Sequence, residues 1–145
     1  AEHIVPGKPY KVRIRPTAFA RREDCRIEVT VEGNSAEEKA EIGIGLTSLP
    51  QETFIFDPQT GIMGSWGFQN PEIGWMGMGV IFPNDRFARL DEQPNEHRVV
   101  MPYEKGKPLV YHIQSRWLKG LRFSCCPSAQ DWGNILKVNA NQIKK

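Results

Sequence analysis

The segment from Leu109 to Trp117 carries the side chains best suited to chemistry. Read as a strand, it places an imidazole, an amide and a guanidinium on one face, from His112, Gln114 and Arg116. Same-face neighbours lie roughly 7 Å apart, so this row offers donors, acceptors and a cation on a rigid surface. Such a row suits sugar hydroxyls and carboxylates, because Arg can hold a carboxylate through two parallel hydrogen bonds. The alternative is a solvated outer face. Along the opposite face lie Tyr111, Ile113, Ser115 and Trp117.

Two histidines are candidates for acid–base work. The segment from His97 to Tyr103 also reads as a strand, and Glu104–Lys107 reads as a tight turn between it and Leu109–Trp117. We therefore expect these strands to pair as a hairpin, which would place His97 opposite the region near Ile113 and close to His112. Two adjacent imidazoles could act as acid and base on a sugar, so the catalytic candidates are His97 and His112.

Aromatic side chains and glycines suggest a stacking surface. Trp75, Gly77 and Gly79 alternate along one predicted strand, so a large ring stands beside a bare backbone floor. Gly43 and Gly45 would form a second floor. A sugar ring could stack there, or the glycines could mark a curved or bulged sheet. The predicted substrate-binding residues are Trp66, Trp75, Tyr111, Gln114 and Arg116.

A row of basic residues has two interpretations. Lys11, Arg13 and Arg15 alternate along a predicted strand, with Arg21 and Arg22 nearby. The row could meet an acidic polymer, or it could pair with Glu28 and Glu32 of the next strand. We favour pairing between the strands.

Composition excludes several classes of protein. The net charge of +2 is too small for the concentrated basic face of a nucleic-acid-binding protein, and no apolar run approaches the roughly 20 residues of a membrane span. Cys25, Cys125 and Cys126 are odd in number and form no metal motif, so we expect no metal, no cofactor and buried free thiols. A bridge from Cys25 and a reactive thiol near Cys125 are the alternatives.

The elements that must position these residues are mostly strands. Period-two alternation over Tyr10–Arg15, Arg26–Glu32 and Ala40–Thr47, with turn residues between, is typical of half-buried strands. After Pro127, Ser128 and Asp131 resemble a helix cap, and Trp132 begins an apolar helical face. We predict a mostly β fold, an antiparallel β-sandwich with one C-terminal α-helix, as a single domain over residues 1–145.

Five segments, read in order, resemble a known family. They are Glu41–Leu46, Thr60–Ile62, Trp75–Pro83, Tyr111–Trp117 and Asp131–Trp132. Together they resemble the C-terminal part of an uncharacterised-domain family of bacterial polysaccharide-degradation loci, whose members accompany glucuronyl hydrolases and polysaccharide lyases. The resemblance implies a galactose-mutarotase-like sandwich, of which this chain would be one portion of a larger supersandwich.

We therefore expect a carbohydrate-active domain that binds or processes an acidic polysaccharide or oligosaccharide, with a periplasmic or extracellular location. If it is an enzyme, it would be a polysaccharide lyase or glycoside hydrolase. Neither nucleic acid nor a membrane is an expected partner. A missing partner segment or a second copy of the chain could complete the site. The alternative is a non-catalytic β-sandwich module for binding or assembly.

Overall fold

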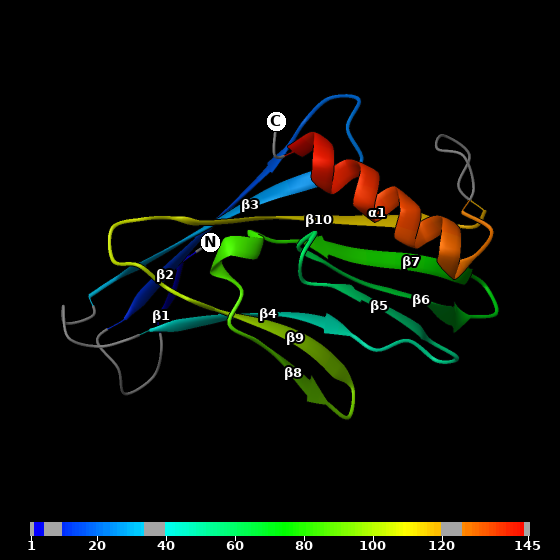
Figure 1. Ribbon diagram of the computed structural model, residues 1–145, viewed down its shortest axis with the longest axis horizontal. Helices are drawn as coiled ribbons and strands as arrows, with labels where there is room; N and C mark the ends of the chain where they lie inside the picture. Colours follow the sequence, from blue (N-terminus) through cyan, green and yellow to red (C-terminus); the bar gives the residue numbers. More distant parts are fainter. Residues whose placement is uncertain (1, 5–9, 34–39, 120–125, 144–145) are drawn as a thin grey trace.

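The computed structural model describes residues 2–4, 10–33, 40–119 and 126–143 (Figure 1). Its elements are strands, one short 3₁₀ turn and one α-helix. In chain order they are β1 (Glu2–Ile4), β2 (Lys11–Ala18), β3 (Asp24–Glu32), β4 (Glu41–Thr47), β5 (Thr53–Asp57), β6 (Ile62–Asn70), β7 (Gly74–Ile81), the 3₁₀ turn Asn84–Arg86, β8 (Arg89–Gln93), β9 (Glu96–Pro102), β10 (Leu109–Trp117) and α1 (Ala129–Ile143).

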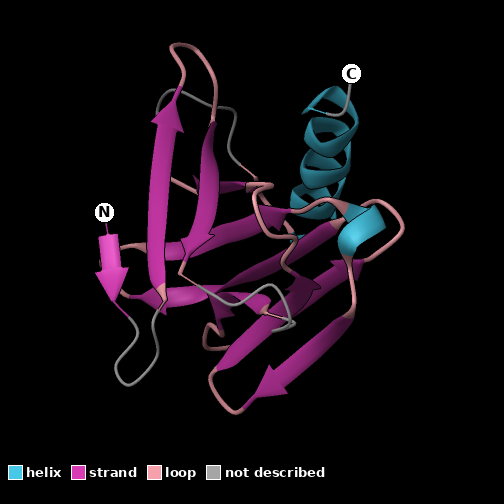
Figure 2. Cartoon of the chain, turned by 90° about the vertical axis from the view of Figure 1, so that its left-hand side faces the viewer, coloured by secondary structure: helices cyan, strands magenta, loops and turns pink. Residues whose placement is uncertain are grey.

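The described strands form two antiparallel sheets. The large sheet has the order β1-β2-β3-β10-β7-β6-β5, and the small sheet has the order β4-β9-β8. The two sheets pack face to face, and α1 covers the opposite face of the large sheet, so the molecule has three layers (Figure 1). In Figure 2 the helix stands to one side of the strands. The predicted class, a mostly β sandwich-like fold with one C-terminal helix, is confirmed.

Alternation in the strands explains the core between the sheets. Along β3, Ile27 and Val29 are buried while their neighbours are polar, and in β9 Val99 and Met101 face them from the small sheet. Because a side chain every second residue points to the same face, each strand delivers its apolar set to one layer. The basic residues of β2 pair with acidic residues of β3, which is the interpretation favoured from the sequence. Arg13, for example, lies 3.2 Å from Glu32.

The helix begins and docks through specific contacts. Ser128 Oγ accepts a hydrogen bond from the Asp131 backbone N–H at 3.2 Å, which satisfies one of the unpaired donors at the helix start. Trp132, fully buried, donates from Nε1 to the Met78 carbonyl at 3.1 Å. Leu136 packs one turn later. The helix therefore lies directly on the backbone of β6 and β7.

The predicted hairpin of β9 and β10 is wrong. The turn at Glu104–Lys107 forms, with a hydrogen bond from Lys107 N–H to Glu104 C=O, but β9 pairs with β4 and β8 while β10 pairs with β3 and β7. Both strands present apolar residues to the same inter-sheet core, so they pack across it instead of pairing. His97 and His112 consequently stand in different sheets.

Other local predictions also need correction. The bare glycine floor of β7 does not receive a ligand, because Trp132 covers Gly77 and Leu136 covers Gly79. The stretch Arg89–Gln93, which lies outside the strands predicted from the sequence, is the edge strand β8, whose exposed polar side chains suit a sheet edge. The short strand predicted at 121–124 lies outside the described residues.

Adding a methyl group at Gly77 should test how closely α1 packs on β7. A Cβ there would lie 2.6 Å from the Trp132 ring, which is fully buried and has no room to move. We expect Gly77→Ala to lower the free energy of unfolding by about 1–3 kcal/mol, measured by urea denaturation.

Gly43→Ala is the matched control for this prediction. Its Cβ would meet the Arg98 side chain at 2.5 Å, but that side chain is partly exposed and flexible. We expect nearly unchanged stability. Equal losses of unfolding free energy in the two variants would argue against the close packing of Trp132 on Gly77 as the cause.

Candidate functional site

His112 is paired with a carboxylate from the neighbouring strand. Its Nδ1 lies 2.7 Å from Oδ2 of Asp24, at the start of β3, and the two side chains are 10% and 8% exposed. An ionised carboxylate only accepts hydrogen bonds, so Nδ1 carries the proton and donates. In the neutral ring this leaves Nε2 as an acceptor, the arrangement in which a carboxylate orients a histidine base.

Arg22 holds the same carboxylate from the other side. Its Nε and Nη2 donate to the two Asp24 oxygens at 2.8 Å each. Burial alone would raise the pKa of Asp24, but the hydrogen bonds from Arg22 and His112 and their charges outweigh it, so the pKa is lowered from its ordinary value. Asp24 is therefore ionised at neutral pH and ties the β2–β3 turn to β10.

The other polar residues of β10 are held in the same region. Arg116 donates from Nε and Nη2 to Glu23 at 2.7 Å each, a two-point pair between half-buried groups. Gln114, 6% exposed, accepts a hydrogen bond from Asn139 of α1 at 2.8 Å, while its Nε2 has no partner among the described residues. The predicted row His112, Gln114 and Arg116 therefore does not face open solvent and meets a turn and the helix.

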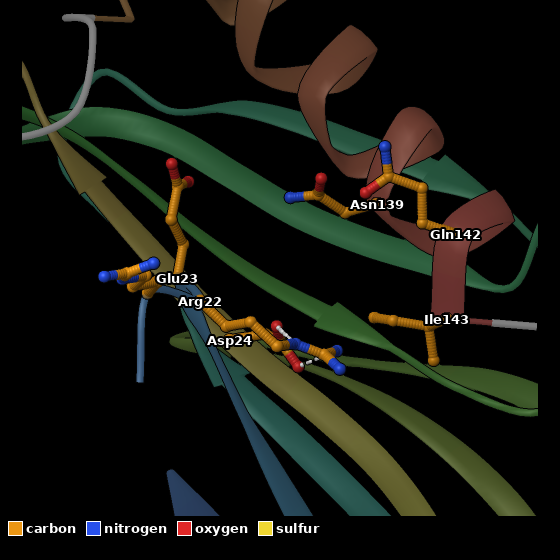
Figure 3. Close-up of a pocket in the computed structure, with 7 residues that line it drawn as sticks. Arg22, Glu23, Asp24, Asn139, Gln142 and Ile143 are labelled. Carbon is orange, nitrogen blue, oxygen red and sulfur yellow. Dashed lines mark hydrogen bonds and ion pairs between the residues drawn. The ribbon is translucent and has the colours of Figure 1, made fainter. Parts of the chain in front are cut away.

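A polar cavity opens between that turn and the helix. We call it the turn cavity. It has a volume of about 360 Å³, and Figure 3 shows carboxylate and guanidinium groups of the turn on one side and α1 side chains on the other. Its lining residues are Arg21, Arg22, Glu23, Asp24, Asn139, Gln142 and Ile143.

A family model described as a domain of unknown function, DUF4861, matches residues 2–145. The chain belongs to the DUF4861 family. No curated protein and no solved structure matches the chain significantly.

The aromatic residues proposed for this DUF4861 domain lie away from the turn cavity. Trp66 is 4% exposed and stacks on half-buried Trp75, with ring centroids 6.3 Å apart, and both pack in the layer beneath α1. Tyr111 is half-buried against the inter-sheet core, and this burial, with a smaller contribution from Cys25, raises the pKa of its phenol. Trp66, Trp75 and Tyr111 are thus not brought together with Gln114 and Arg116 in one open surface.

His97 belongs to a separate cluster, between the small sheet and β5. Its Nε2 lies 2.9 Å from Glu52 and 3.2 Å from Ser48, and its ring stacks on Phe54 of β5 at 3.8 Å. Its Nδ1 lies 3.7 Å from Glu92. Because Phe54 belongs to the large sheet and His97 to the small sheet, these contacts join the two layers.

Some members of the DUF4861 site were not found in the sequence. Glu23 and Asp24 stand at a turn, where acidic residues are common for local reasons, so nothing marked them as partners of β10. Asn139 had a usable signal: it lies three residues after Leu136 and seven after Trp132, on the apolar face of the helix. A polar residue on that face needs a partner, which Gln114 supplies.

The described residues give no positive evidence for a metal site, a membrane-spanning helix or a reactive thiol. Within the described residues, no group of three or more His, Cys, Asp or Glu side chains could hold a metal ion. The one helix described is too short and polar to cross a membrane. Half-buried Cys25 and buried Cys126 are free thiols, and Cys125 lies outside the described residues.

Removing the Asp24 carboxylate should lower stability in a pH-dependent way. Its folded-state pKa lies below the unfolded value near 3.8, so its contribution is present above that pH and is lost as pH falls through the folded-state value. We expect Asp24→Asn to lower the free energy of unfolding by about 1–3 kcal/mol at pH 7 and by much less near pH 2, measured by urea denaturation.

Glu41→Gln serves as the control, because Glu41 pairs with Arg89 at an exposed site on the small sheet. We expect a much smaller change there. A deficit in Asp24→Asn that stays constant from pH 7 to pH 2 would rule out the charged pair as its origin.

Proposed function

We propose that this domain binds or processes an acidic polysaccharide or oligosaccharide, and that the turn cavity receives one of its sugar units. The observation that carries the proposal is the charge of Arg21, which pairs with no acidic side chain of the described residues. The rest of the cavity is lined by paired charges, two amides and Ile143. Among the described residues, the two carboxylates of the cavity are matched by Arg22 and Arg116. Arg21 has no such partner there, so the cavity favours an anion.

The backbone at Arg21 supports a functional role. Its φ of 65° lies in the left-handed region, in the turn closed by the hydrogen bond from Arg22 N–H to Phe19 C=O. Glycine is the residue preferred at such a turn position, and a side chain there costs free energy. Strained positions cluster at functional sites, and a cationic side chain at such a position supports a role in ligand binding.

The remaining groups suit the rest of a sugar. Asn139 and Gln142 offer amide donors and acceptors, and Glu23 and Asp24 offer further acceptor oxygens for hydroxyls. His112, oriented by Asp24, would supply the acid or base if the sugar is processed. The packed surroundings of His97 add no support for the catalytic role predicted for it.

The resemblance to a family of bacterial polysaccharide-degradation loci supports the same proposal. Under it, the domain is part of a galactose-mutarotase-like supersandwich that acts in the periplasm or outside the cell. The broad sheet with a helix on one face is compatible with that architecture.

A non-catalytic assembly module is the second candidate, favoured by exposed apolar surface. Phe19, Ile113 and Trp117 are 38%, 41% and 43% exposed. Ile113 also lines a mainly apolar cleft of about 560 Å³ between β4 and the large sheet. Clustered exposed apolar residues often mark protein interfaces.

Replacing Arg21 with glycine separates ligand binding from folding. Glycine relieves the left-handed backbone, so we expect Arg21→Gly to keep or raise the free energy of unfolding by up to about 1 kcal/mol. Without the cation, we expect at least tenfold weaker retention on a uronic-acid polysaccharide in affinity gels, with a weaker salt dependence than the wild type.

The control is Arg89→Gln, which removes the same charge from the outer face of the small sheet. We expect it to bind like the wild type. A wild-type domain that is folded but retained by no uronic-acid polymer would refute the proposal and favour the assembly module.

A further inference from the structure

We infer that the edge of α1 forms a two-site groove that takes two consecutive acidic sugar units, with Ile143 and the Asp24–His112 pair at the junction. This inference rests on the proposed function and extends it, because it names the minimum length and the charge pattern of the glycan.

Two cavities meet at the end of the helix. The turn cavity is the first. The second, which we call the histidine cavity, has a volume of about 280 Å³ and is lined by Arg26, Ile81, Phe82, Pro83, Val110, His112 and Ile143. Ile143 lines both cavities and stands on the α1 side of the turn cavity in Figure 3. Ile143 is the lining residue that the two cavities share, and each cavity has room for one small ring.

The floor beneath the two cavities is continuous. Asp24 lines the turn cavity, His112 lines the histidine cavity, and their side chains are joined at 2.7 Å. In the sheet register Asp24 faces Gln114 and Arg26 faces His112, two residues along the same strands. Two residues of a strand span roughly 7 Å, which is the separation of these two pairs along the floor.

Each cavity has an arginine that lacks a full acidic partner among the described residues. In the turn cavity it is Arg21. In the histidine cavity, Arg26 shares the carboxylate of Glu28 with Arg15, at 3.0 and 3.6 Å, so two guanidinium groups meet one carboxylate. A positive charge in each of the two cavities suits a chain that carries a carboxylate on successive units.

The histidine cavity also has an apolar wall. Phe82, 1% exposed, and Pro83 line it beside Ile143, opposite the polar groups of Arg26 and His112. One apolar and one polar side are what a sugar ring presents, because its C–H face is apolar and its hydroxyls and carboxylate are polar.

The test measures affinity against chain length. Uronic acids of the galacto, gluco, manno and gulo series, each as one, two and four linked units, are titrated into the domain and followed by calorimetry or NMR shifts. We expect two units to bind at least tenfold more tightly than one. We expect Arg26→Gln to remove most of that gain, because the second unit then loses the cation of the histidine cavity.

Two matched controls accompany these measurements. Ile143→Trp should fill the junction and weaken binding of two units at least tenfold, while Val138→Trp adds the same ring at an exposed helix position and should not. Arg98→Gln breaks a strand pair of the same spacing as Arg26–Glu28, on the other sheet, and should bind normally. Circular dichroism and urea denaturation verify that each variant is folded.

The outcomes separate this inference from the proposed function. Equal affinity for one and two units, or unchanged binding by both Arg26→Gln and Ile143→Trp when Arg21→Gly is impaired, overturns the two-site groove and leaves single-unit binding intact. A wild-type domain that binds none of these acids at any length overturns the proposed function, and the groove with it.

Discussion

Bare backbone on β6 and β7 allows Trp132 and Leu136 to lie directly on the large sheet, and the rest of the site depends on that contact. A Cβ at Gly64, Gly77 or Gly79 would fall within about 2.4–2.6 Å of one of these two side chains. Close seating fixes the height and direction of α1, and the Trp132 hydrogen bond to Met78 fixes its position along the strand. Asn139 and Ile143, two and three turns further on, are thereby held beside β10.

The helix changes the surroundings of the polar face of β10. Without α1 it would be a solvated row, whereas beside the helix and the β2–β3 turn it becomes the floor of two cavities. The carboxylates of Asp24 and Glu23 pair with His112, Arg22 and Arg116. The positive charge near the groove therefore comes from Arg21 and from the Arg15–Arg26 pair. The positive charge beside the two cavities comes from cations that lack a full partner among the described residues, not from the small net charge of the chain.

The two sheets are joined differently at different places. At one end, His97 stacks on Phe54 and binds Glu52, so the small sheet is anchored to β5. Further along, Tyr103 bonds the backbone of Val31 through its hydroxyl, where the chain crosses from β9 to β10. Near Ile113 the small sheet no longer covers the large one, and the apolar cleft opens. The two candidate functions thus use opposite faces of the same strand, β10.

The amino-acid sequence by itself determined the class of fold, most of the strands, the capped C-terminal helix and the polar row of His112, Gln114 and Arg116. These follow from alternation, turn residues and helical spacing, which are properties of neighbours along the chain. Only the tertiary structure decided that β9 and β10 belong to different sheets, that Trp132 fills the glycine floor, and that Asp24 and Asn139 complete the site. Strand partners and side-chain partners far apart in sequence depend on how apolar faces pack in three dimensions, and alternation identifies the face of a strand but not what will cover it.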